Sequence, residues 1–292
     1  SASGCLHQLH LPSLPWPASS SLLKGINIRD RFVRVALAFK TIDLFAGPGG
    51  LSEGFAAIGD GSGNRIFDVV LSVEKEPSAF ETLRLRSFFR QFRQAPECYY
   101  AYAAGRISKE ELLTRYPREW AAAVKETVML ELGTPEARKW LDPVIDRIRN
   151  DAKEGTVLIG GPPCQAYSLV GRVRNRGIPG YEPAADHRNF LYEEYSRILN
   201  RLNPLAFVME NVKGMLSSEV NGESIIDRIL TDLRAAGGRP GTYTLLPLVP
   251  ATSGSLAGHV VRSEDYGIPQ CRHRVILLGI QSDVLARGRV AA

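Results

Sequence analysis

Residues 157–168 read VLIGGPPCQAYS, a buried-strand pattern that ends in glycines, prolines and a cysteine. Val157, Leu158 and Ile159 have the length and β-branched content of a buried strand, which two glycines and two prolines then end abruptly. Cys164 therefore follows a strand end, where ligands bind in open parallel α/β sheets. A lone cysteine is most often a small buried hydrophobe, but the preceding prolines fix the backbone and aim the thiol in one direction. We therefore interpret Cys164 as a reactive group.

A glycine turn between two further strand patterns precedes this stretch. Residues 38–45 have the pattern of a strand, and the glycine-rich segment 46–50 leads directly into helical apolar spacing over residues 51–58. The next strand pattern, residues 67–73, ends at Glu74, where an acid can accept hydrogen bonds from two ribose hydroxyls. This order predicts a nucleotide-binding α/β unit.

The rest of the chain continues to alternate helical and strand patterns. From about residue 80 to about 150 the pattern is mainly helical, and we interpret this region as a helical insertion whose charges form a solvated face. Beyond Cys164 the sequence predicts helices at 190–199 and 225–236 and strands at 205–209, 243–249 and 275–280. The predicted fold class is therefore α/β, with a mostly parallel sheet and helices on both faces.

Two segments have no regular pattern. Residues 1–38 begin without methionine and include PSLPWPASSS, so we expect a disordered extension, native or added for expression. The segment 165–188 carries four arginines and a histidine among glycines and prolines. A long loop beside a reactive group is usually functional, often a lid.

Composition excludes several classes of protein. The chain has 292 residues, of which 44% are hydrophobic and 23% charged, and its formal net charge of +5 leans toward a polyanionic partner. Its four cysteines and five histidines show no metal-ligand spacing, so we expect neither disulfides nor a metal. Every apolar run is shorter than the ~18 residues that span a bilayer. We therefore expect a cytoplasmic protein without membrane association.

Four motifs stand at predicted strand ends: DLFAGPGG at residues 43–50, GPPCQ at 161–165, ENV at 210–212 and QCRHR at 270–274. In this order they resemble the signature motifs of the bacterial DNA cytosine-5 methyltransferases. The glycine turn alone is a weak signal, but the four together are specific, and the resemblance covers about residues 39–280. It implies the Rossmann-like fold of S-adenosylmethionine-dependent methyltransferases, with residues 39–292 as the catalytic domain.

The resemblance implies methyl transfer to C5 of a cytosine flipped out of double-stranded DNA, in a restriction-modification or epigenetic marking system. The Cys164 thiolate would add to C6, because this converts the 5,6 double bond into an enamine that accepts a methyl group. A protonated Glu210 would hydrogen-bond N3, Arg274 would hold O2 of the base, and Arg272 would support the site. Because a buried thiol cannot reach a stacked base, the cytosine must leave the duplex, and the basic loop 165–188 would clamp the DNA.

The methyl donor that the resemblance implies is S-adenosyl-L-methionine. It assigns Glu74 to the ribose hydroxyls, and the remaining cofactor residues are Phe45, Gly47, Gly49, Gly50, Pro163 and Leu191. Two departures stand out. Lys75 occupies a position where the family often has a large hydrophobic residue. The family's aspartate for the adenine amino group cannot be assigned, since the nearest region is 132–134 and the other acids are Asp142, Asp146 and Asp151.

Other functions were weighed against this one. A nicotinamide-dependent oxidoreductase would suit the glycine turn, but Ser52 occupies the last position of GxGxxG and the motifs around Cys164 and Glu210 would be unexplained. A catalytically silent nucleic-acid-binding protein is disfavoured by the intact Cys164, Glu210 and Arg274. The RNA-directed branch of the same family stays open.

The end of the chain raises a further expectation. In the resembling family the QxRxR strand is followed by a variable DNA-reading region and by a closing motif that completes the cofactor pocket. Neither is found before residue 292. We therefore expect a fragment, or one half of a split enzyme that needs a second polypeptide for target recognition.

Overall fold

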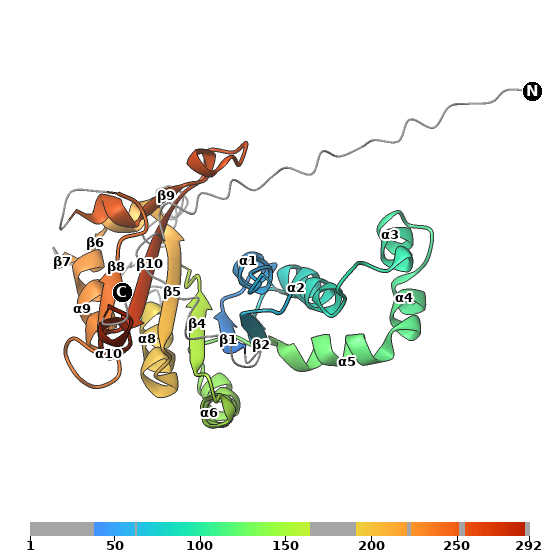
Figure 1. Ribbon diagram of the computed structural model, residues 1–292, viewed down its shortest axis with the longest axis horizontal. Helices are drawn as coiled ribbons and strands as arrows, with labels where there is room; N and C mark the ends of the chain where they lie inside the picture. The colour runs from blue at the N-terminus through green and yellow to red at the C-terminus, as the bar shows by residue number, and fades with distance from the viewer. Residues whose placement is uncertain (1–37, 62, 164–190, 221–222, 251–254, 290–292) are drawn as a thin grey trace, which may run out of the picture.

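The computed structural model describes residues 38–61, 63–163, 191–220, 223–250 and 255–289. Its strands are β1 (Phe39–Leu44), β2 (Phe67–Glu74), β3 (Thr127–Met129), β4 (Thr156–Gly160), β5 (Ala206–Val212), β8 (Tyr243–Leu246), β9 (Val260–Arg262) and β10 (His273–Gln281), with a short separate pair, β6 (Glu219–Val220) and β7 (Glu223–Ser224). Within this part of the chain the main sheet has eight strands in the order β3-β2-β1-β4-β5-β10-β8, and β9 pairs with β10 (Figure 1). The pairs from β3 to β5 are parallel, whereas β10 runs antiparallel to β5, β8 and β9. This confirms the predicted α/β fold with a mostly parallel sheet.

Helices cover both faces of this sheet (Figure 1). The α-helices of the described residues are α1 (Gly50–Ala56), α2 (Pro77–Arg90), α3 (Glu97–Ala103), α4 (Lys109–Arg115), α5 (Pro117–Glu126), α6 (Pro135–Asp151), α8 (Leu191–Leu202), α9 (Ile225–Ala235) and α10 (Ser282–Arg289). Of these, α1, α2, α5, α8, α9 and α10 pack on strands of the sheet and α6 packs on α8, whereas α3 and α4 pack on each other and α4 on α5. Side chains alternate along β1, because successive residues of a strand point to opposite faces. Ile42 and Leu44 join the main core with residues of α6, α8 and α9, while Asp43 contacts Ser52 of α1. The two faces therefore differ, one apolar and the other partly polar.

The helix α8 shows how the sequence builds the apolar face. Its buried residues include Leu191, Tyr195, Ile198, Leu199 and Leu202, a spacing of three and four residues that forms one stripe on a helix. The stripe packs on the strands from which Ile42 and Leu44 project. The parallel strand β4, covered on both faces, is buried at every position, as a continuous apolar run predicts.

The region predicted as a helical insertion contains helices and one strand that the sequence did not reveal. The strand β3 is only three residues long and forms an edge of the sheet. Phe88, Leu112 and Ala123 form the centre of a separate small core for α2, α4 and α5. In Figure 1 α3 and α4 stand off from the sheet, whereas α5 runs directly into β3. The domain boundaries proposed from the sequence stay predictions.

Several element boundaries differ from the sequence interpretation. β5 continues through Glu210 to Val212, and β10 begins at His273, so Glu210 and Arg274 lie within strands rather than beyond them. β8 ends earlier than predicted, at Leu246. Cross-strand hydrogen bonding between β5 and β10 extends both strands, a tertiary effect that local patterns do not report.

Searches of the described ranges found neither a helix long and apolar enough to cross a membrane nor a group of three or more His, Cys, Asp or Glu that could hold a metal ion. Cys98 and Cys271 are free thiols. The predicted N-terminal extension and the basic loop 165–188 lie outside the described residues.

Candidate active site

The glycine turn after β1 places three residues in the left-handed region, two of them glycines. Phe45 has φ 55°, Gly47 has φ 56° and Gly49 has φ 88°, all in the left-handed region. A Cβ added to Gly49 would lie 2.9 Å from Cδ1 at the end of the Leu83 side chain, which would have to shift, and the φ of 88° independently favours glycine here. The turn leads the chain from β1 into α1 at the carboxyl edge of the sheet.

Glu74 connects this turn to the next strand. Its Oε2 accepts a hydrogen bond from the backbone N–H of Gly47 at 2.7 Å. Its Oε1 accepts from the backbone N–H groups of Lys75 at 2.9 Å and Glu76 at 2.7 Å. An ionised carboxylate has about four lone-pair sites, so three backbone donors leave it with little spare capacity. The fold itself therefore fixes this carboxylate.

A cavity of about 370 Å³ opens at the carboxyl ends of β2, β3 and β4. It is lined by Phe45, Val73, Glu74, Lys75, Glu76, Leu130, Glu131, Leu132, Gly161, Pro163 and Leu191. Four of the residues predicted to bind the cofactor, Phe45, Glu74, Pro163 and Leu191, thus meet at one cavity. Gly47 does not line the cavity but donates a hydrogen bond to Glu74, which does. Gly49 and Gly50 lie at the start of α1 and are not among the lining residues.

Sequence reasoning missed one wall of this cavity. Leu130, Glu131 and Leu132 follow the unrecognised strand β3. Glu131 pairs with Lys75, whose Nζ lies 2.9 Å from Oε1 of the glutamate. The short run Thr127–Met129 was the available signal, but a three-residue strand inside a helical region is too brief to identify from periodicity.

Glu210 and Arg274 meet at the same edge of the sheet. Arg274 Nε lies 2.8 Å from Glu210 Oε1, and the side chains are 25% and 24% exposed. They come together because β10 is antiparallel to β5, which places the start of one strand beside the end of the other. A Cβ on Gly161 would lie 3.2 Å from Glu210 Oε2. Since Gly161 also lines the cavity, the ion pair adjoins the cavity wall.

Asn211 ties this pair to the segment that leads toward the predicted nucleophile. Its Nδ2 donates to the carbonyl oxygen of Pro162 at 3.1 Å, and its side chain is buried. Cys164 itself lies outside the described residues. Arg272 is exposed and lies just before β10. Among the described contacts it forms no hydrogen bond or ion pair with Glu210, so its predicted supporting role stays a prediction.

A second carboxylate, Asp43, is buried beneath the glycine turn. The Ser52 hydroxyl donates to Asp43 Oδ2, and no hydrogen bond from the described residues reaches Oδ1. Burial raises the pKa of Asp43 to about 7, an effect that the Ser52 hydrogen bond and the nearby charge of Arg90 only partly offset. Burial likewise raises the pKa of Glu126, which accepts from Arg90. Burial thus raises the pKa of both of these carboxyl groups on the polar side of the sheet, Asp43 on β1 and Glu126 at the end of α5.

Comparison with known proteins decides the family. A family model described as C-5 cytosine-specific DNA methylase matches residues 39–92 and 144–288. The chain belongs to this family. Residues 93–143, which include α3, α4, α5 and β3, fall between the two matched segments.

Curated relatives of this chain are named type II methyltransferases. M.Bpa9945I of Bacillus paralicheniformis is 34% identical over 263 residues, which cover 82% of this chain and 53% of the relative. M.BspRI of Lysinibacillus sphaericus is 28% identical, covering 84% and 45% respectively. A solved structure of a DNA modification methyltransferase encoded within an E. coli prophage is 24% identical with a TM-score of 0.49, covering 85% of this chain and 48% of that one. The chain spans about half the length of these relatives.

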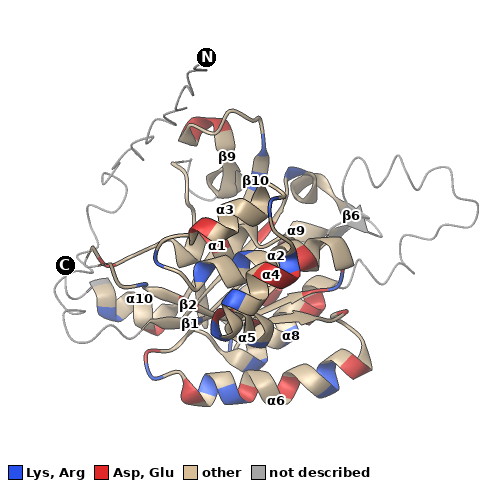
Figure 2. Ribbon diagram, turned by 90° about the vertical axis from the view of Figure 1, so that its right-hand side faces the viewer, with Lys and Arg blue, Asp and Glu red and all other residues tan. Residues whose placement is uncertain are grey.

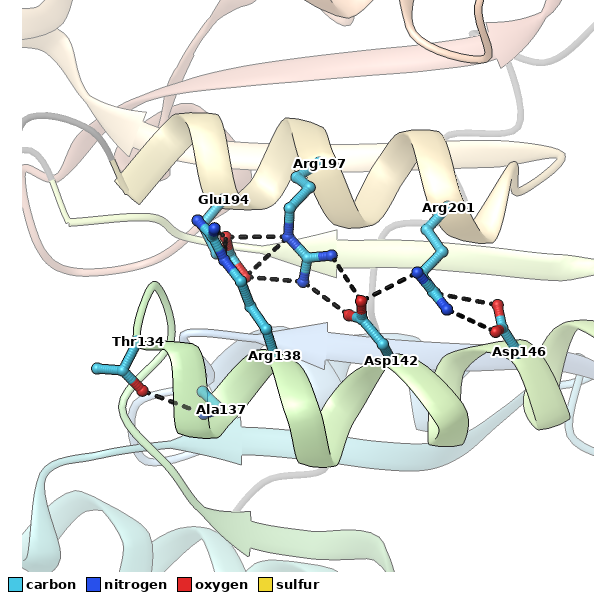
Figure 3. A network of polar contacts seen from close by, with 8 residues as sticks. All are labelled: Thr134, Ala137, Arg138, Asp142, Asp146, Glu194, Arg197 and Arg201. Atoms are coloured by element: carbon cyan, nitrogen blue, oxygen red, sulfur yellow. Dashed lines mark hydrogen bonds and ion pairs between the residues drawn. The ribbon is translucent and has the colours of Figure 1, made fainter.

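Asp142, Asp146 and Asp151, which the sequence offered as adenine partners, are not among the residues lining the cavity. Asp142 and Asp146 form ion pairs between α6 and α8 (Figure 3), and Asp151 is the exposed last residue of α6. We use the name α6–α8 ladder for the ion-paired residues Arg138, Asp142, Asp146, Glu194, Arg197 and Arg201. Of the acids near residues 132–134, Glu131 lines the cavity.

Proposed function

We propose that this chain provides the cofactor site and the catalytic groups of a DNA cytosine-5 methyltransferase, with S-adenosyl-L-methionine as methyl donor. One observation carries the proposal. Gly161 lines the cavity and also lies against Glu210, so a methyl donor in the cavity would adjoin the Glu210–Arg274 pair. Methyl transfer requires this proximity, because donor and acceptor must be held in contact.

The cavity residues fit the proposed cofactor. Apolar walls from Phe45, Leu132 and Leu191 suit an adenine ring, and about 370 Å³ is within the range of small-molecule sites. The cavity is also rich in carboxylates, which favours a cationic sulfonium group. When bound, S-adenosyl-L-methionine supplies an electrophilic methyl group.

Two carboxylates of this cavity would hold opposite ends of the adenosine. Glu74 would accept a ribose hydroxyl at its remaining lone-pair site, and a second hydroxyl would have to displace one of the three backbone donors. Glu131, which lines the cavity, would accept from the adenine amino group and is our proposal for the family position that the sequence left unassigned.

The base would be handled by the neighbouring groups. Cys164 would attack C6 of the flipped cytosine, forming a C–S bond while the ring electrons shift toward C5. Glu210 would donate a hydrogen bond to N3 and Arg274 would bind O2, so that both offset the charge that develops on the ring. Arg274 and Glu210 pair with each other in this structure. When the base binds, hydrogen bonds from both side chains to the polar edge of the base would replace this ion pair.

The proposed substrate is double-stranded DNA. The relatives are named as type II methyltransferases and the family as a DNA methylase, which supports a role in restriction-modification. The similarities give no support to the second polypeptide that the sequence led us to expect, and we do not propose one.

The test is transfer of tritium from labelled S-adenosyl-L-methionine to duplex DNA, single strands and transfer RNA, together with a covalent trap. Duplex DNA is expected to accept the label, and duplex DNA that contains 5-fluorocytosine is expected to form an adduct that survives denaturing gels, because fluorine cannot leave as the C5 proton does. Cys164→Ala should form no adduct but keep cofactor affinity. Label transfer to RNA alone would favour the RNA-directed alternative, and an adduct with Cys164→Ala would show that another residue is the nucleophile.

A further inference from the structure

Alternating charges join α6 to α8 along their length (Figure 3). Arg138 Nε donates to Glu194 Oε2 at 3.0 Å, and Arg197 bridges Glu194 and Asp142. Farther along, Arg201 bridges Asp142 and Asp146. Figure 2 shows acidic and basic residues interspersed along α6. The interface between these helices is thus ionic as well as apolar.

The α6–α8 ladder is most buried at one end. The side chain of Glu194 is 2% exposed, whereas those of Asp142 and Asp146 are 22% and 34% exposed. A buried charge that loses its partner is far more costly than an exposed one, because water cannot replace the lost contact. The Glu194 end therefore constrains the two helices most strongly.

That buried end lies next to the proposed cofactor cavity. α8 begins at Leu191, one turn before Glu194, and α6 begins after Gly133 and its N-cap Thr134, one turn before Arg138. A Cβ on Gly133 would lie 3.1 Å from Cδ2 of Leu191, so the two helix starts are in contact. Leu191 and the adjoining Leu132 both line the cavity.

We infer that Glu194, held by Arg138, is a positioning residue for the cofactor: it keeps the start of α8 against the start of α6 and so sets the spacing of Leu191 and Leu132 in the cavity. The inference rests on the proposed function, because it assumes that S-adenosyl-L-methionine occupies the cavity. Neither Glu194 nor Arg138 lines the cavity, so their effect on affinity would pass through the helices.

Arg138→Met is the main test, since Arg138 is half exposed and its replacement leaves Arg197 to pair with Glu194. Isothermal titration of the full chain with S-adenosyl-L-methionine should show about 5- to 30-fold weaker binding. Arg138→Lys, which restores a positive charge, should recover most of the affinity. Glu194→Gln should weaken binding further if it folds.

Arg201→Met provides the matched control, because it breaks ion pairs between the same helices at the far, exposed end. We expect it to leave cofactor affinity within about twofold of wild type, even where urea denaturation shows a comparable loss of stability. Equal weakening by Arg138→Met and Arg201→Met would overturn the inference, as would unchanged affinity in Arg138→Met. Failure of the wild-type chain to bind the cofactor would instead count against the proposed function.

Discussion

The two carboxylates at the carboxyl edge of the sheet, Glu74 and Glu210, are held in different ways. Glu74 accepts three hydrogen bonds from backbone N–H groups, whereas Glu210 pairs with the side chain of Arg274. Backbone donors are fixed by the fold, but a side-chain partner can be exchanged for a ligand. The comparison indicates that the proposed cofactor half of the site, around Glu74, is ordered before binding. The proposed base half, around Glu210 and Arg274, completes its contacts only when the base binds.

The largest expected effect is on the base half. Glu210→Gln keeps the shape of the side chain but removes the acid, so we expect kcat/KM for labelled methyl transfer to fall about 10²–10⁴-fold. Cofactor affinity should change little, because Glu210 is not among the residues lining the cavity. Glu264→Gln is the control, because Glu264 pairs with His273, which precedes Arg274 on β10. A comparable loss in that control would mean that any disturbance of β10 impairs the reaction.

The next effect concerns the buried carboxyl group beneath the cofactor half. The raised pKa of Asp43, about 7 against a usual 3.8, means that the folded protein retains a proton that the unfolded chain has released. This group therefore lowers the free energy of unfolding as pH rises from about 4 to about 7, and the loss persists above that range. Asp43→Asn, neutral at every pH, should be more stable than wild type at about pH 8 by up to roughly 4 kcal/mol and unchanged at about pH 4.

Urea denaturation at the two pH values measures this difference. Asp68→Asn on the adjacent strand is the control, because Asp68 is 44% exposed and pairs with Lys40. A gain in Asp43→Asn that is as large at about pH 4 as at about pH 8 would contradict the assignment of the effect to ionisation.

The smallest expected effect is on cofactor affinity. Glu74→Ala removes the acceptor for the ribose and for the Gly47 N–H, and we expect calorimetry to show about 10- to 100-fold weaker binding of S-adenosyl-L-methionine. Glu76→Ala removes a negative charge from the same cavity but leaves the Gly47 contact intact. If both variants weaken binding equally, net charge rather than the fixed carboxylate determines affinity.

Local patterns were sufficient for the longer parallel strands β1, β2, β4 and β5, but not for the three-residue β3. The apolar run predicted β4, and the glycine-rich segment predicted the turn between β1 and α1, both of which the structure contains. The strand and the turn depend on neighbours within a few residues, so periodicity and glycine placement reveal them. The role predicted for Glu74, binding ribose hydroxyls, stays a prediction, and its contact with the Gly47 N–H is a finding of the structure.

Features that depend on distant segments could not be predicted in the same way. The antiparallel direction of β10 decides that Arg274 meets Glu210, yet strand direction leaves no mark in the sequence of the strand itself. Glu131 reaches the cavity only because β3 pairs with β2. Cys164, the nucleophile predicted from the sequence, lies outside the described residues, so both its position and its role stay predictions.

The three-residue strand β3 carries one wall of the cavity at the edge of the sheet. An edge strand has hydrogen-bonded neighbours on one side only, and short edges open without unfolding the core. The amides of residues 127–132 are therefore expected to exchange with solvent deuterium faster than those of β4 at the centre. The side of the cavity formed by Leu130 and Leu132 is thus the side that opens more easily. A ligand in the cavity would slow amide exchange in residues 127–132 more than in β4.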